Sequence, residues 1–163
     1  MEPTFKLSQL EDRAKAYEEF IPMLYALVSA ENDFISLLAN VSAAIHEAFG
    51  FFWVGFYLVS ERDDLLHIGP FQGSVACSRI KKGRGVCGTA WQNESTVIVP
   101  DVDEFPGHIA CSSSSKSEIV VPMLKDGKVI GVLDIDSVQL NEFTVTDQTY
   151  LEEIVNHLCH IDC

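Results

Sequence analysis

The chain has 163 residues, of which 47% are hydrophobic and 21% charged, and its net charge is −13. This length and apolar fraction predict a single domain over residues 1–163 with a substantial core, and they argue against disorder. The negative charge argues against nucleic acid and against an anionic membrane as partners, because both would be repelled.

The five cysteines are the unusual part of the composition. An odd number of cysteines, in a chain long enough to fold without disulfides, argues against a secreted disulfide framework. Residues 1–4 lack the basic and apolar pattern of a signal peptide, and no apolar run reaches the roughly 18 residues of a membrane-spanning helix. We therefore expect a reduced, cytoplasmic protein whose thiols need a separate explanation.

Two amphipathic helices are predicted in the first third of the chain. In the first, apolar residues recur at helical spacing over residues 17–28. In the second, the apolar stripe covers residues 34–49, with Asn32 or Asp33 as the N-cap and Gly50 at the C-terminal cap.

Strands are predicted to follow these helices. Residues 51–59 are apolar on both faces, which is typical of a central strand, and the polar residues 61–64 form a turn. A returning strand is predicted over 65–72, with a bend or bulge at Gly69-Pro70, and a further strand over 75–80.

Residues 101–117 have no apolar periodicity. So long an irregular segment in a compact domain is usually a functional loop or lid. Helices, then an antiparallel sheet, then a helix predict an α+β fold with helices on one face. The other elements predicted here are a short helix at 86–92, a β segment at 97–99, a hairpin of strands 119–124 and 129–135, and a C-terminal helix that starts at Thr146-Asp147 and carries its apolar stripe to Ile161.

The cysteines differ in their surroundings. Cys111 lies in the polar segment 108–115, which could not bury a thiol by its own apolarity, and an accessible thiol suits nucleophilic or redox chemistry. The neighbours of Cys87 allow either a core residue or a thiol at a helix N-terminus. Cys159 falls at helical spacing from Val155, which favours a small buried hydrophobic residue.

A zinc site is the other use of cysteine and histidine to consider. The chain has no C-x-x-C pair, and the spacing of Cys77, Cys87 and Cys111 fits no compact structural site. His108 and Cys111 form an isolated H-x-x-C, which is a weak signal. We therefore predict no bound metal.

Acidic residues end the second strand of the predicted hairpin. Period-two alternation places Ile130, Val132, Asp134 and Asp136 on one face, and Glu118 opens the neighbouring strand. Either the strand end emerges into water, or cross-strand pairing brings the three carboxyl groups together. Such a cluster would suit an ammonium ligand, a metal or a proton donor with a raised pKa.

Trp53 and Tyr57 share one face of the first predicted strand, with Gly55 between them. They are either part of an aromatic core or the wall of a pocket whose N–H or O–H groups meet a ligand. The loop at residues 83–85 matches no nucleotide fingerprint, and the serines at 112–115 form no serine-hydrolase elbow.

Several motifs, in the same order along the chain, resemble the free methionine-(R)-sulfoxide reductases, a family built on a GAF domain. The resemblance extends from about residue 12 to about residue 160. The motifs are Trp53-Val54-Gly55-Phe56-Tyr57, Gly69-Pro70-Phe71-Gln72-Gly73 with Cys77, Gly83-Arg84-Gly85-Val86-Cys87-Gly88, His108-Ile109-Ala110-Cys111, Ser117-Glu118-Ile119-Val120, and Gly131-Val132-Leu133-Asp134-Ile135-Asp136-Ser137.

This resemblance implies a GAF-type fold, with a central antiparallel sheet, the N-terminal and C-terminal helices on one face and the active-site loops on the other. It also implies an oxidoreductase that repairs free methionine-(R)-sulfoxide to methionine. The expected partners are this substrate and a thioredoxin-like reductant, the expected assembly is a homodimer, and no metal, flavin or nucleotide cofactor is required.

The resemblance assigns roles to three of the thiols. Cys111 matches the catalytic nucleophile, which would become a sulfenic acid on releasing methionine. Cys77 matches the principal resolving thiol and Cys87 an auxiliary one, although which of the two resolves the sulfenic acid in this protein stays open. Cys159 and Cys163 match no catalytic position.

The resemblance also assigns the acids and the aromatic residues. Glu118, Asp134 and Asp136 match active-site acids that bind the substrate, and Trp53 and Tyr57 match the pocket wall. Mutual repulsion would raise the pKa of at least one acid, which could then protonate the sulfoxide oxygen. A remaining carboxylate could pair with the ammonium group of a free amino acid.

Two other functions are compatible with parts of this pattern. A non-catalytic GAF module that binds a small ligand or senses redox state would share the fold, because fold alone does not determine function. A thiol peroxidase would use the same thiols on hydrogen peroxide, but it would leave the acidic residues unexplained.

Overall fold

Helices and antiparallel strands make up residues 4–163, the part of the chain that this computed structural model describes. Residues 1–3 lie outside the described residues. They belong to the segment 1–4, for which the sequence predicts no signal peptide. The helices are α1 (Arg13–Val28), α2 (Phe34–Phe49), α3 (Gly85–Asn93), the 3-10 helix η1 (Val102–Glu104) and α4 (Val145–Cys159). The strands are β1 (Trp53–Ser60), β2 (Leu65–Gln72), β3 (Arg79–Lys81), β4 (Val97–Val99), β5 (Ser117–Lys125) and β6 (Lys128–Ser137).

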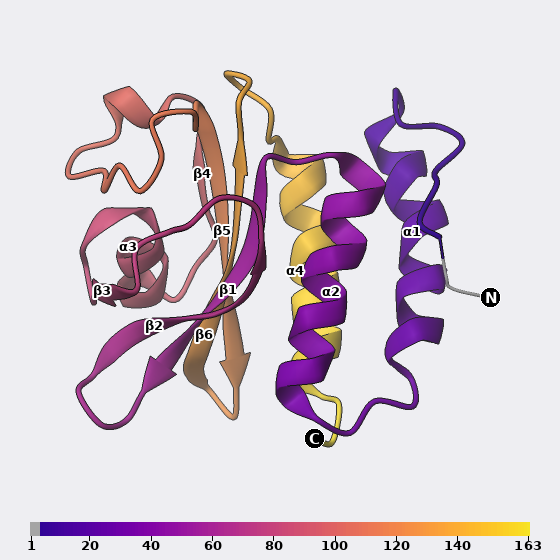
Figure 1. Cartoon of the computed structure of the whole chain (residues 1–163), viewed down its shortest axis with the longest axis horizontal. Coiled ribbons are helices and arrows are strands. Elements are labelled where there is room, and N and C mark those ends of the chain that lie inside the picture. The colour runs from indigo at the N-terminus through magenta and orange to yellow at the C-terminus, as the bar shows by residue number, and fades with distance from the viewer. Residues whose placement is uncertain (1–3) are drawn as a thin grey trace.

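The strands form one antiparallel sheet in the order β3-β2-β1-β6-β5-β4. Helices α2 and α4 pack against one face of this sheet, and α1 lies outside them as a further layer (Figure 1). The other face carries α3 and the loop at 100–116 (Figure 1). The expected α+β fold, with terminal helices on one face and loops on the other, is therefore confirmed.

Local signals in the sequence explain where the long helices begin and end. The Asp33 side chain accepts a hydrogen bond from the Ser36 N–H at 2.7 Å, so Asp33 is the N-cap of α2. Gly50 ends that helix with a φ of 67°, a conformation that glycine adopts without steric cost. The predicted caps of this helix are therefore confirmed.

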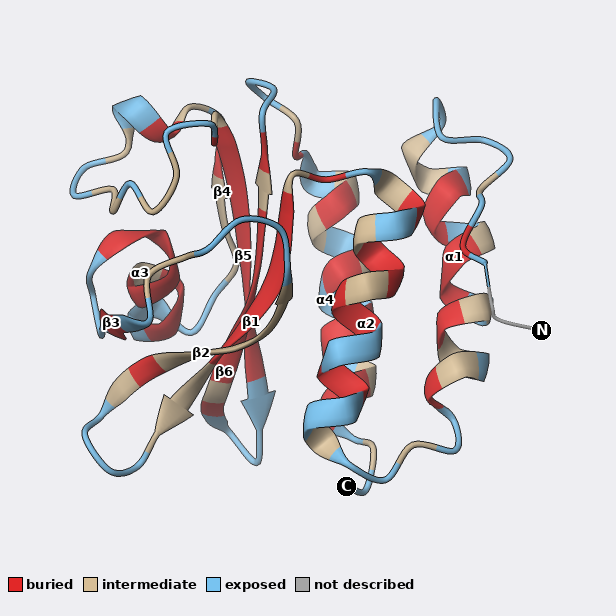
Figure 2. Ribbon diagram, viewed as in Figure 1, coloured by how far each residue is buried: buried red, intermediate tan, exposed pale blue. Residues whose placement is uncertain are grey.

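Two hydrophobic clusters lie on opposite faces of the sheet. In Figure 2 buried residues run along the central strands. The larger cluster joins the sheet to α1, α2 and α4. The smaller one joins the sheet to α3 and includes Trp53, Tyr57, Cys87 and Trp91. A sheet covered on both faces explains why β1 is apolar at nearly every position.

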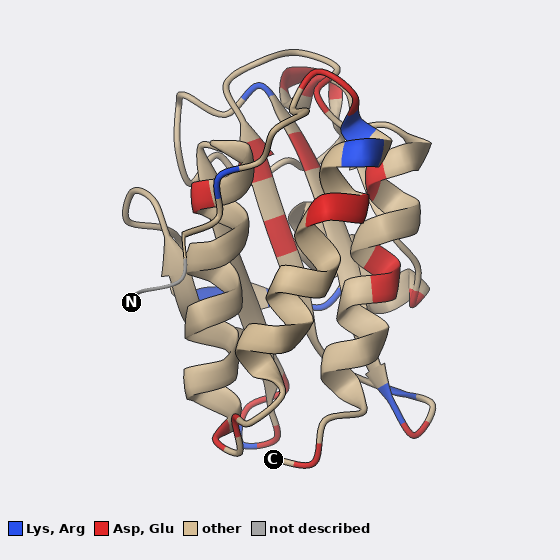
Figure 3. Cartoon of the chain, turned by 90° about the vertical axis from the view of Figure 1, so that its right-hand side faces the viewer, with Lys and Arg blue, Asp and Glu red and all other residues tan. Residues whose placement is uncertain are grey.

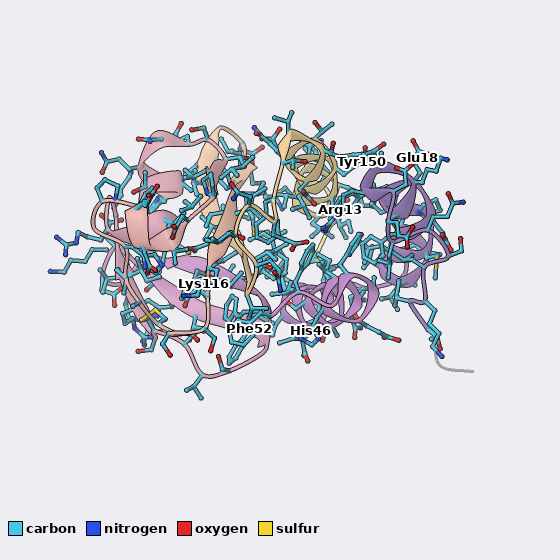
Figure 4. The ribbon with its side chains drawn as sticks, turned by 90° about the horizontal axis from the view of Figure 1, so that it is seen from above. Arg13, Glu18, His46, Phe52, Lys116 and Tyr150 are labelled. Carbon is cyan, nitrogen blue, oxygen red and sulfur yellow. A yellow bond between two sulfur atoms is a disulfide. The ribbon has the colours of Figure 1, made fainter. Side chains whose placement is uncertain are left out.

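Arg13 ties α1 to the start of α4. Its guanidinium pairs with Glu142 and lies 3.5 Å from a carboxylate oxygen of the buried Asp147. The Tyr17 hydroxyl donates a hydrogen bond to the same aspartate at 2.8 Å. In Figure 4 the Arg13 side chain lies between α1 and α4, where it partly compensates the burial of the aspartate charge.

Most of the acidic excess lies at the surface. In Figure 3, acidic segments outnumber basic ones along the helical side of the molecule and in the loops at its ends. Within residues 4–163, no helix is long and apolar enough to cross a membrane.

Three details of the sequence prediction were wrong. Residues 75–78 belong to a loop, and the strand predicted there covers only Arg79–Lys81. Ile161 lies beyond the end of α4 at Cys159, although it still packs against the larger core. Ile130 was predicted to share a face with Val132, but it packs on the helical side of the sheet while Val132 packs on the α3 side. The cause is a register shift between β5 and β6. Met123 pairs with Gly131 and Leu124 with Val129, so Ile130 has no partner on β5.

Candidate active site

A pocket with an empty volume of about 540 Å³, part of it open to solvent, lies between the sheet and α3. The loop at 73–78 and the loop at 100–116 close its sides. Of the site residues predicted from the sequence, Trp53, Tyr57, Cys87, Cys111, Glu118, Asp134 and Asp136 line this pocket. The remaining one, Cys77, is bonded to Cys111, so the fold brings together residues from positions 53 to 136.

Cys77 and Cys111 form a disulfide, with their Cα atoms 5.5 Å apart. The bond joins the two loops that flank the pocket, and both cysteines are partly exposed. The pairing implied by the resemblance is therefore present. A partly exposed disulfide between irregular segments is open to attack by an external thiolate.

Trp53 and Tyr57 hold the loop that carries Cys77. The Trp53 indole N–H donates to the Ser74 carbonyl oxygen at 2.9 Å, and the Tyr57 hydroxyl donates to the Cys77 carbonyl oxygen at 3.0 Å. Both rings are almost fully buried, at 4% and 1% exposure, and both line the pocket. They are thus core residues that also form a pocket wall, but their N–H and O–H groups donate to the loop rather than to a ligand.

Gly55 lets these two rings lie against the sheet. A Cβ atom at this position would lie 2.4 Å from the Phe71 Cβ and 2.5 Å from the Trp53 ring. The Trp53 and Tyr57 rings are stacked over this gap with centroids 6.0 Å apart. The glycine is therefore needed for close approach of side chains rather than for a special backbone angle.

The three predicted acids meet through strand pairing. Glu118 on β5 is directly opposite Asp136 on β6, and Asp134 is paired with Gly55 on β1. Glu118 and Asp134 are buried at 5% and 6% exposure, and Asp136 is partly buried. The strand end therefore does not emerge into water, and the cluster alternative is the correct one.

Burial gives these carboxyl groups unusual proton affinities. Loss of water and the charge of Asp136 raise the pKa of Glu118 to about 8. Burial and the neighbouring Glu118 carboxyl raise the pKa of Asp134, while burial and Asp134 raise that of Asp136, partly offset by a hydrogen bond from Ser115. At neutral pH the cluster holds protons that it could donate to a bound oxygen.

Cys87 lies in the first turn of α3, and its thiol is buried against the acids. A helix N-terminus favours a thiolate. Here burial and the charges of Asp134 and Glu118 outweigh that effect and raise the pKa of the Cys87 thiol. The thiol is therefore protonated at neutral pH.

His108 also lines the pocket, although its position in the sequence did not predict a site residue. Its Nε2 atom lies 3.7 Å from a carboxylate oxygen of Glu118, and the side chain is 15% exposed. The charge of His108 also lowers the pKa of Asp134. The H-x-x-C pattern that His108 forms with Cys111 was the only sequence feature that pointed to this residue. No pattern connected His108 with Glu118, so the contact could not be predicted.

The raised pKa of Glu118 predicts a dependence of stability on pH. Between about pH 4.5 and 8 the unfolded chain releases the Glu118 proton while the folded protein keeps it, so this group makes the free energy of unfolding fall as pH rises. The slope is at most about 1.4 kcal/mol per pH unit for one proton. We expect the free energy of unfolding of Glu118→Gln, measured by urea unfolding from roughly pH 5 to 8, to decrease less steeply with pH than that of the native protein. An unchanged slope, relative to the exposed control Glu61→Gln, would contradict the burial argument.

Comparison with known proteins places these features in a family. Residues 31–159 match the GAF domain family. The chain is 58% identical over 146 residues to GAF domain-containing protein A of Dictyostelium discoideum, covering 90% of this chain and 92% of that protein. It is 47% identical over 134 residues to the free methionine-R-sulfoxide reductase of Escherichia coli, covering 82% of this chain and 80% of that enzyme.

A solved structure is similar over the same extent. The X-ray structure of free methionine-R-sulfoxide reductase from Neisseria meningitidis, in complex with its substrate, superposes with a TM-score of 0.90 at 54% identity. The match covers 91% of this chain and 89% of that one. The similarity thus extends over most of both proteins.

Proposed function

Because this chain belongs to the free methionine-R-sulfoxide reductases, a family with a GAF domain, we propose that it reduces free methionine-(R)-sulfoxide to methionine. The observation that carries this proposal is the Cys77–Cys111 disulfide beside a pocket that contains three acids with raised pKa values. A disulfide accounts for the two electrons of the reduction, and protonated acids account for activation of the sulfoxide oxygen.

In the proposed reaction, the reduced Cys111 attacks the sulfoxide sulfur while an acid of the cluster protonates the oxygen. The oxygen passes to Cys111, which becomes a sulfenic acid, and methionine leaves. The Cys77 thiol then displaces water from the sulfenic acid and forms the disulfide. Cys77 is the main resolving thiol in this scheme because it is bonded to Cys111, and the protonated Cys87 is auxiliary.

The acids divide two tasks in this proposal. One neutral acid among Glu118, Asp134 and Asp136 donates the proton, and an ionised one pairs with the substrate ammonium group. A peptide-bound methionine sulfoxide lacks that ammonium group, so the arrangement favours the free amino acid. Trp53 and Tyr57 supply the apolar wall for the methionine side chain.

A thioredoxin-like dithiol would restore the two thiols, and no bound cofactor or metal is needed for the redox steps. We also propose a homodimer and a cytoplasmic location, where reduced thiols persist.

A thioredoxin-coupled assay tests the function directly. Purified protein would receive the free R sulfoxide, the free S sulfoxide or a peptide-bound sulfoxide, and methionine release would be measured with thioredoxin and, separately, with dithiothreitol. We expect turnover of the free R form alone. Absence of methionine release with both reductants would favour a ligand-binding GAF module, and consumption of hydrogen peroxide in its place would favour a thiol peroxidase.

Tyr57→Phe tests whether the aromatic wall also positions the resolving thiol. The variant keeps the ring but loses the hydrogen bond to the Cys77 carbonyl oxygen. A single hydrogen bond contributes about 0.5–1.5 kcal/mol, so we expect disulfide formation after one turnover to slow by about 2- to 10-fold. Quenched-flow thiol counting would measure this rate. The control Tyr150→Phe removes an exposed hydroxyl that binds Glu18 on the helical side, and equal rates in both variants would refute the role of Tyr57.

A further inference from the structure

Three candidate ligands for a metal ion, one thiol and two carboxyl groups, meet in the pocket. The Cys87 sulfur, a Glu118 oxygen and an Asp134 oxygen all lie within 4.8 Å of one another. They come from α3, β5 and β6, so none of the sequence spacings typical of zinc sites connects them. A thiolate with carboxylates is a donor set that Zn²⁺ accepts, whereas Mg²⁺ and Ca²⁺ prefer oxygen alone.

A second observation points to a ligand at this place. The Asp134 Oδ1 atom is buried and has no hydrogen-bond partner among the described residues, and its side chain is only 6% exposed. A buried polar atom without a partner costs free energy, and a bound cation would supply the missing interaction. Because Asp134 lines the pocket, an ion could reach this atom from solvent.

His108 lies beside one of these three ligands. Its Nε2 atom is 3.7 Å from Glu118, and it enters the pocket from the loop that carries Cys111. Imidazole nitrogen is a common zinc ligand, and four ligands from cysteine, histidine and carboxylates make a tetrahedral site.

We propose that Cys87, Glu118 and Asp134, with His108 as a fourth ligand, form an inhibitory site for a thiophilic divalent cation such as Zn²⁺. Binding replaces the Cys87 S–H bond by a sulfur–metal bond and releases the thiol proton, together with protons held by the acids, to solvent. No electron is transferred. The binding site stands on geometry alone, while its inhibitory effect rests on the proposed function, because the ion would occupy the acids that receive the substrate.

Cobalt binding to the disulfide form tests the site without any measurement of activity. When Cys77 and Cys111 are bonded, Cys87, Cys159 and Cys163 are the free cysteines of the described chain. We would use a Cys163→Ser background to remove the exposed thiol and titrate with Co²⁺ alone. We expect one equivalent to produce a thiolate-to-cobalt charge-transfer band that one equivalent of Zn²⁺ abolishes.

Matched variants decide which thiol binds. In the same background, Cys87→Ser should lose the band, and Cys159→Ser, which removes a buried thiol from α4, should keep it. Asp134→Asn should weaken Co²⁺ binding by about 10- to 100-fold while circular dichroism shows an unchanged fold. A band that survives Cys87→Ser, or the absence of any band in the parent protein, would overturn the proposal.

Turnover assays separate this proposal from the proposed function. We expect Zn²⁺ to inhibit methionine sulfoxide reduction in competition with the substrate when a phosphine that does not chelate metal replaces the dithiol. Cobalt binding by a protein without reductase activity would leave the site standing and refute the function. Reductase activity without cobalt binding would refute only the site.

Discussion

Cys111→Ser is expected to lower turnover of free methionine-(R)-sulfoxide by about 10³-fold or more, because the serine hydroxyl cannot take up the sulfoxide oxygen and return it as water. Cys111 lies on the pocket and is partly exposed, so the substitution should leave the fold intact. The measurement is methionine release under steady-state conditions with dithiothreitol, which removes any dependence on the choice of physiological reductant.

Cys77→Ser should behave differently, and the contrast is the stronger part of the test. This variant keeps the nucleophile, so it should release about one methionine per active site and then stall as a sulfenic acid with thioredoxin. A sulfenic-acid probe should label it at Cys111. Cys159→Ser serves as the control, since this buried thiol lies on α4 away from the pocket. Wild-type turnover in Cys111→Ser would refute the assignment of the nucleophile.

Glu118→Gln is expected to lower kcat by about 10²-fold and to change the pH profile, which makes it the second large effect. In the native protein the pKa of Glu118 is about 8. If its proton is the one transferred to the sulfoxide, the active form disappears as pH rises above 8, and the rate should fall about tenfold per pH unit there. The glutamine variant cannot titrate and should lack this alkaline decline.

The same experiment assigns the other acids. A residue that donates the proton should affect kcat, whereas one that pairs with the substrate ammonium group should mainly raise KM. If Glu118 donates the proton, the one of Asp134 and Asp136 that pairs with the ammonium group should mainly raise KM when it is changed to Asn. The control is Glu61→Gln, an exposed acid on the β1–β2 turn. Unchanged profiles in all three pocket variants would exclude the cluster from the mechanism.

Much of the fold followed from local patterns in the sequence. The apolar stripes of α1 and α2, the Gly50 cap and the existence of the β5–β6 hairpin depend on neighbours within a few residues, and each was predicted correctly. Asp33 was one of two predicted N-caps, the other being Asn32. The predicted bend at Gly69-Pro70 is also present, as a shift of register between β1 and β2. The errors at 75–78 and Ile130 arose where pairing with another strand, rather than the segment itself, sets the conformation.

Only some residues of the candidate active site could be predicted from local patterns. The polar segment around Cys111 and the acidic end of the apolar face at Asp134 and Asp136 indicated reactive groups. Glu118 was added because it opens the neighbouring strand, and the family resemblance supplied the roles. His108 was left out of the candidate site. No local pattern could show that its ring approaches Glu118, or that Trp53 and Tyr57 donate to the loop of Cys77.

The five thiols and the charge of −13 illustrate the same division. The sequence by itself determined the elements, the fold class and the types of reactive group, because these depend on periodicity, capping and composition. Only the tertiary structure decided that Cys77 meets Cys111, that Cys87 lies protonated against two acids, and that Glu118 and Asp134 are buried. Burial and proximity between distant segments set those proton affinities and contacts, and both are properties of the packed sheet rather than of any single segment.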